Sequence, residues 1–140
     1  MMSDIPKAGT QLWYQHYAQK IDELGDEMDL PNDEIENAKE LWEEAIGTSR
    51  APLPLAVDCL YICAKLSGNR VSIKATKRIT KRLWGKAVEV LPLDRRRNTR
   101  RWVWDYKEFI LSMYPDEDAW DDFTEAWQDK VVDVTYFEEE

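Results

Sequence analysis

The chain has 140 residues, of which 44% are hydrophobic and 34% charged, with only five Gly and six Pro. This is the composition of one folded domain and not of a disordered chain. No run of about 18 uncharged apolar residues occurs, and the first residues lack the basic, apolar, small-residue order of a signal peptide. We therefore expect a cytoplasmic protein that does not interact with membranes.

Apolar side chains recur every three or four residues from Thr10 to Met28, which predicts a first helix with one buried stripe. Pro31 then interrupts the chain. Asn32 is the expected N-cap of a second helix, because its side-chain oxygen can accept a backbone N–H. The buried face of this second helix is predicted to consist of Ile35, Ala38, Leu41, Trp42 and Ala45.

A third helix is expected from Leu55 to Leu66, with Pro52 and Pro54 at its entrance. Asp58 and Lys65 are its only charged residues. A helix that is apolar nearly all round is buried on all sides, so we place this one at the centre of the domain.

A fourth helix is predicted to begin after a cap at Ser72, and Gly85 is expected to end or loosen it. Apolar residues and threonines face inward in this prediction. The outward face carries Lys74, Lys77, Arg78, Lys81 and Arg82.

The fifth helix is predicted to run from Arg95 to Tyr114, with Asp94 as its cap and Pro115 beyond its end. Its inner face should comprise Trp102, Tyr106, Phe109, Ile110 and Met113. A short acidic helix follows, marked by Trp120, Phe123, Trp127 and Val131. Its aromatic residues either pack on the helical body or offer an acidic, hydrophobic strip to another protein; we favour packing.

Charge is distributed very unevenly along the chain, whose formal net charge is −9. Residues 65–101 carry 13 basic and 2 acidic side chains, a net charge of +11, whereas residues 1–50 sum to −8 and residues 102–140 to −11. A partner responds to the local patch within a Debye length of about 8 Å. The basic block at 65–101 is therefore the predicted working surface.

Five arginines occupy the first two turns of the fifth predicted helix: Arg95, Arg96, Arg97, Arg100 and Arg101. The helix dipole disfavours cations at this end, and the pairs spaced four apart repel each other. A docked anion would relieve both effects, and nucleic-acid phosphates are the commonest candidate. The alternative is that these arginines pair with the acidic ends of the same chain.

The sequence offers little for catalysis. Cys59 and Cys63 lie four residues apart in the third helix, where we interpret them as small core residues and not as a redox pair or half a metal site. With His16 as the one histidine, there are too few soft ligands for a closed zinc site. No Gly-rich phosphate loop or nucleophile elbow occurs. We expect no enzyme, no cofactor and no metal.

The middle of the chain resembles a cyclin-box repeat of the archaeal and eukaryotic transcription initiation factor B family. The resemblance covers roughly residues 10–113, and its most specific part is Leu60-Tyr61-Ile62 followed by Ser67-Gly68. Further matching stretches are Leu30-Pro31, Ala38-Lys39-Glu40-Leu41-Trp42, Ala51 to Gly68 as a whole, and Val71-Ser72-Ile73-Lys74.

The resemblance implies an all-α, five-helix cyclin-like bundle over residues 8–114, whose last two helices form a helix-turn-helix on DNA. Residues 115–140 are then an acidic C-terminal extension with a helix and a tail. The fifth helix becomes the recognition helix, whose N-terminal residues reach base edges in such motifs. These residues are Arg95, Arg96, Arg97, Asn98, Arg100 and Arg101. The chain carries one repeat and no zinc ribbon, which predicts a reduced, single-repeat regulator.

We therefore expect a DNA-binding transcriptional regulator whose partners are double-stranded DNA and RNA polymerase or other transcription proteins. Lys74, Lys77, Arg78, Lys81 and Arg82 are predicted to hold phosphates. The alternative function is a protein-interaction module that docks an acidic partner or the transcription machinery. A third hypothesis is that the acidic tail covers and inhibits the basic surface.

Overall fold

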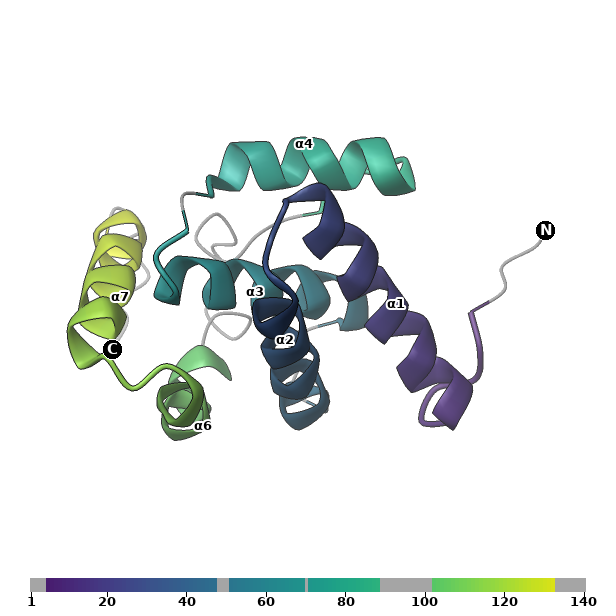
Figure 1. Ribbon diagram of the computed structural model, residues 1–140, viewed down its shortest axis with the longest axis horizontal. Helices are drawn as coiled ribbons and strands as arrows, with labels where there is room; N and C mark the ends of the chain where they lie inside the picture. Colours follow the sequence, from purple (N-terminus) through teal and green to yellow (C-terminus); the bar gives the residue numbers. More distant parts are fainter. Residues whose placement is uncertain (1–4, 48–50, 70, 89–101, 133–140) are drawn as a thin grey trace.

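The computed structural model describes residues 5–47, 51–69, 71–88 and 102–132, and all regular secondary structure in these ranges is helical (Figure 1). This confirms the all-α prediction for the described residues. The helices are α1 (Gln11–Glu27), α2 (Asn32–Ala45), α3 (Pro52–Leu66), α4 (Ile73–Trp84), α6 (Lys107–Met113) and α7 (Glu117–Val132). One further helical turn lies at residues 102–105. No helix in these ranges combines the length and apolar character needed to cross a membrane.

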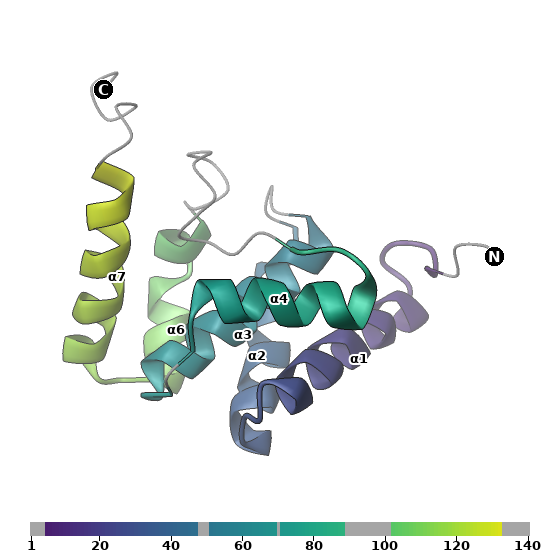
Figure 2. The same ribbon diagram turned by 90° about the horizontal axis from the view of Figure 1, so that it is seen from above.

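Helix α3 lies at the centre, with the other helices arranged around it (Figures 1 and 2). Every residue from 55 to 66 is buried except Lys65, which confirms the predicted central helix. The helix begins at Pro52, three residues before the predicted start. Proline suits a first helical turn, because its missing N–H would have no partner within the helix there.

Helix α1 matches its predicted range closely, and α2 has the predicted buried face but a different N-cap. Thr10 caps α1, its Oγ1 accepting a hydrogen bond from the Trp13 N–H at 3.2 Å. The predicted cap of α2 at Asn32 is wrong, because the N-cap is Pro31. The Pro31 carbonyl already accepts from the N–H of Ile35, which places Asn32 inside the helix. Asp33 supplies the polar contact at this end, its Oδ1 accepting from Glu34 N.

The crossing of α1 and α2 depends on Gly25. This glycine is buried in α1, and a Cβ atom added to it would lie 2.6 Å from Cγ1 of Ile35 in α2. Such a distance is far below van der Waals contact. The missing side chain therefore lets the two helices approach closely, at a cost of about 1 kcal/mol in helix propensity relative to alanine.

Four aromatic residues of α1 and α2 form one cluster in the core. Trp42 stacks on Tyr17 with ring centroids 5.4 Å apart, and it also contacts the rings of Trp13 and Tyr14. Its side chain is only 1% exposed, and its Nε1–H donates to the carbonyl oxygen of Pro52 at 3.0 Å. Trp42, which belongs to α2, therefore contacts both α1 and the start of α3.

The predicted continuous fifth helix is wrong in the part that the structure describes. Tyr106 interrupts it with φ −109° and ψ 20°, between the turn at 102–105 and α6. The stretch Trp102-Val103-Trp104-Asp105-Tyr106 consists of weak helix formers, because aromatic and β-branched side chains lose rotamer freedom in a helix. The predicted inner residues Trp102 and Ile110 are nevertheless buried. Residues 95–101 lie outside the described ranges.

The aromatic face of α7 packs on the body of the protein. Trp120 and Phe123 are buried in the same core as α3, and the Phe123 ring lies 6.3 Å from the Tyr61 ring. This confirms the packing interpretation for these two side chains. Asp121 and Asp122 of the same helix are exposed.

Both cysteines are reduced and buried, as the interpretation as core residues requires. Cys63 lies next to the Tyr114 hydroxyl, which also accepts a hydrogen bond from Asn37 Nδ2 at 3.0 Å. Burial raises the pKa of the Cys63 thiol from 9.0 to about 12. Burial also raises the pKa of Cys59 and of Tyr114. The folded state therefore retains protons that the unfolded chain releases.

We expect the free energy of unfolding to be unaffected by these groups below pH 9 and to fall as the pH rises from 9 towards 12. Urea unfolding of the full chain at a series of pH values measures this. A Cys63→Ala variant should show a shallower fall, because it removes one of the groups that the fold keeps protonated. A wild-type stability that stays constant up to about pH 11 would contradict the prediction.

Candidate nucleic-acid interface

Helix α4 carries the cations that the sequence singles out, and its ends lie where they were predicted. Ser72 is the N-cap, its Oγ accepting from the Ala75 N–H at 3.0 Å. Gly85 ends the helix in the left-handed conformation, with φ +80°, and its N–H donates to the Lys81 carbonyl. On the inner face Thr80 is buried and fixes the following segment by accepting from Val88 N at 3.0 Å.

Helix α4 lies on the outside of the molecule, across α1 and α3 (Figures 1 and 2). Side-chain contacts join the last turn of α4 to α1. The Trp84 Nε1–H donates to Glu23 Oε1 at 3.0 Å, and Lys20 Nζ lies 5.4 Å from the centre of the Trp84 ring. Arg82 forms an ion pair with Glu27. None of the other described helices lies over the opposite face of α4 (Figures 1 and 2).

Three cations form a stripe along that outer face: Lys74, Arg78 and Lys81, which we call the α4 stripe. Their spacing of four and three residues places them on one side of a helix. All three are exposed, and none forms an ion pair with another described residue. Neighbours with the same charge at these spacings repel each other. Among the residues that the structure describes, the stripe therefore has no counter-ion.

The remaining predicted cations of α4 flank the stripe. Lys77 is half-buried and already interacts with another group of the protein, so it is not counted in the stripe. Arg82 is 59% exposed but is engaged by Glu27, so pairing with an acidic end of the chain is observed at this position. Other members of the predicted site lie outside the described residues: Arg95, Arg96, Arg97, Asn98, Arg100 and Arg101.

The length of the α4 stripe suits the backbone of duplex DNA. Seven residues separate Lys74 from Lys81, which corresponds to about 10 Å along a helix axis. One strand of duplex DNA carries about three phosphates over that distance. Lysine and arginine on exposed stems can follow such a row of phosphates without rearranging the helix.

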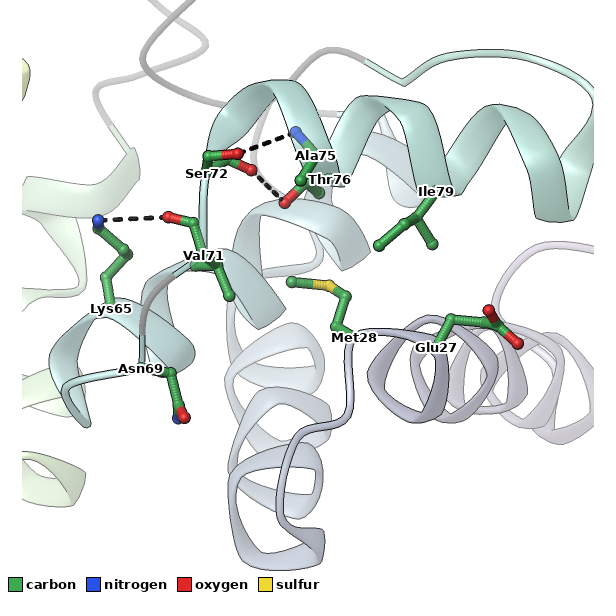
Figure 3. A pocket seen from close by; sticks show the side chains of 9 residues that line it. All are labelled: Glu27, Met28, Lys65, Asn69, Val71, Ser72, Ala75, Thr76 and Ile79. Carbon is green, nitrogen blue, oxygen red and sulfur yellow. Dashed lines mark hydrogen bonds between the residues drawn. The ribbon is translucent and has the colours of Figure 1, made fainter.

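A pocket of about 580 Å³ lies beside the first turns of α4 (Figure 3). We call it the α4 pocket. It is formed by the end of α1, the end of α3 and the start of α4. Its lining consists of Glu27, Met28, Lys65, Asn69, Val71, Ser72, Ala75, Thr76 and Ile79. The sequence contained no signal for it, because the lining comes from three segments that only the fold brings together.

Within the described part of the chain, no three His, Cys, Asp or Glu side chains are grouped so that they could hold a metal ion. Comparisons with protein-family models, with curated proteins and with solved structures found no match to this chain.

Proposed function

We propose that this protein binds double-stranded DNA, with the α4 stripe on the phosphate backbone. The observation that carries the proposal is that Lys74, Arg78 and Lys81 are exposed on one outer helix face without a counter-ion among the described residues. Exposed cations in a row attract a polyanion, and duplex DNA is the polyanion whose charge spacing suits this row.

The basic block extends the proposal to sequence recognition. Residues 95–101 contain five arginines, and arginine reads guanine in the major groove by a bidentate contact. In this proposal the α4 stripe positions the protein on the backbone and the arginines approach base edges. The resemblance to a cyclin-box repeat of the initiation factor B family supports a single-repeat, cyclin-like transcriptional regulator, with RNA polymerase or other transcription proteins as further partners.

A salt series with the full chain and a random 20-base-pair duplex tests the proposal. Each phosphate neutralised on duplex DNA contributes about −0.9 to the slope of log affinity against log salt concentration. Three phosphates on the α4 stripe predict a slope of about −2.7 or steeper. Anisotropy of a labelled duplex measures it. Absence of binding at low salt, or an affinity independent of salt, would rule out phosphate binding by the stripe.

A polyglutamate chain of the same total charge as the duplex serves as the control ligand. Duplex DNA should displace it, because the proposal assigns the stripe to phosphates at the spacing of DNA. If polyglutamate binds as tightly as the duplex, the data favour the alternative function, a module that docks an acidic protein partner.

A further inference from the structure

Arg82 lies beside the α4 stripe, on the side that faces α1. It follows Arg78 by four residues, and because an α-helix has 3.6 residues per turn the two side chains lie about 40° apart around the helix axis. The Arg82 guanidinium is paired with the carboxylate of Glu27, in the last turn of α1. Arg82 therefore continues the row of the α4 stripe, but it already has a counter-ion.

The ion pair of Arg82 and Glu27 is open to competition from anions in solution. The two side chains are 59% and 42% exposed. An exposed ion pair adds little to stability, because both charges stay hydrated and salt screens them. A phosphate offers a guanidinium the same two-oxygen contact as a carboxylate. A phosphate that took the place of Glu27 would leave this carboxylate unpaired beside the bound DNA, and the repulsion offsets the gain.

The position of α4 does not depend on this ion pair. The Trp84 Nε1–H donates to Glu23 Oε1 at 3.0 Å, and Lys20 Nζ lies 5.4 Å from the centre of the Trp84 ring. These contacts hold the end of α4 against α1 without Glu27. Removing the Glu27 charge should therefore release the Arg82 side chain and leave the helix in place.

We propose that Glu27 restrains DNA binding by keeping Arg82 from the phosphate backbone. Glu27 acts in two ways: it occupies the guanidinium, and it places a negative charge beside the α4 stripe. Neutralising its carboxylate removes both effects and adds a fourth phosphate contact to the three of the stripe. This inference rests on the proposed DNA binding, and it assigns a regulatory role to a residue of α1, outside the basic block.

A Glu27→Gln variant of the full chain tests the restraint, because glutamine keeps the shape of the side chain and removes its charge. The affinity for the random duplex should rise about fivefold or more at about 0.1 M salt. The slope of log affinity against log salt concentration should become steeper by about 0.9, since one more phosphate is neutralised. Anisotropy of the labelled duplex measures both quantities, and circular dichroism checks the helix content.

Asp26→Asn is the matched control. Asp26 precedes Glu27 in the last turn of α1, is exposed and forms no ion pair with another described residue. The substitution changes the net charge by the same amount, so it should alter the affinity by less than about twofold and leave the slope unchanged. Equal effects of the two variants would overturn the proposal, because the gain would then come from total charge.

A double variant identifies the released cation. Glu27→Gln combined with Arg82→Gln should lose the gain in affinity and return the slope to the wild-type value, because the fourth contact is then absent. A double variant that keeps the steeper slope would show that Arg82 is not that contact, and the assignment would be wrong.

The two proposals fail separately in this series. If wild type binds the duplex and Glu27→Gln has the same affinity and slope, the restraint alone is refuted. If neither protein binds at low salt, both proposals are refuted. If Glu27→Gln binds and wild type does not, the restraint is supported and the three cations of the α4 stripe are insufficient by themselves.

Discussion

Replacing Lys74 and Arg78 together with glutamate is expected to weaken binding of random duplex DNA by about a hundredfold at physiological salt. Both side chains are exposed on the outer face of α4, so their substitution removes no core contact. Each reversal removes one proposed phosphate contact and adds repulsion at the same place. The slope of log affinity against log salt concentration should become shallower by about 1.8, since two phosphates are no longer neutralised.

A matched control separates this effect from the change in total charge. Lys7 and Lys107 are also exposed, and neither belongs to α4. The Lys7→Glu, Lys107→Glu variant changes the net charge by the same amount and should keep its DNA affinity within about threefold of wild type, because charges beyond a Debye length are largely screened. Equal losses in the two variants would show that the α4 stripe is not the contact surface.

Trp42→Ala is expected to lower the free energy of unfolding by about 3–5 kcal/mol. The side chain is 1% exposed, packs on three other aromatic rings and donates to the Pro52 carbonyl at 3.0 Å. Its removal leaves a cavity where α1, α2 and α3 meet. Small domains have total stabilities of about 5–15 kcal/mol, so the loss is a large part of the whole. Urea unfolding of the full chain measures it.

Trp42→Phe serves as the control for the ring. It retains an aromatic side chain in the cluster but removes the hydrogen bond to Pro52, so it should cost clearly less than the alanine variant. A loss below about 1 kcal/mol for Trp42→Ala would be incompatible with a central position of this residue, because Trp-to-Ala changes in cores cost several times more.

Much of the helical framework could be predicted from local patterns. The range of α1, the buried face of α2 and the central position of α3 followed from apolar spacing, and both ends of α4 followed from the capping residues Ser72 and Gly85. These features depend on interactions within one helix or on the amount of apolar surface that a helix carries.

The errors at element boundaries have a different origin. Asn32 has the right chemistry for a cap, but the carbonyl of Pro31 already accepts the first hydrogen bond of α2. The apolar spacing of residues 102–113 is compatible with one continuous helix, yet the backbone leaves the helix at Tyr106. Apolar spacing reports which side chains are buried, and it does not report whether the backbone between them stays helical.

The sequence by itself determined that the regular structure of the described residues is helical, that α3 is central and that Lys74, Arg78 and Lys81 face outward from α4. Each of these features follows from the order of residues within one segment. Three features came only from the tertiary structure: the ion pair of Arg82 with Glu27, the close approach of the Ile35 side chain to Gly25, and the α4 pocket formed by three segments. These contacts join residues far apart in the chain, and their geometry depends on how the helices pack.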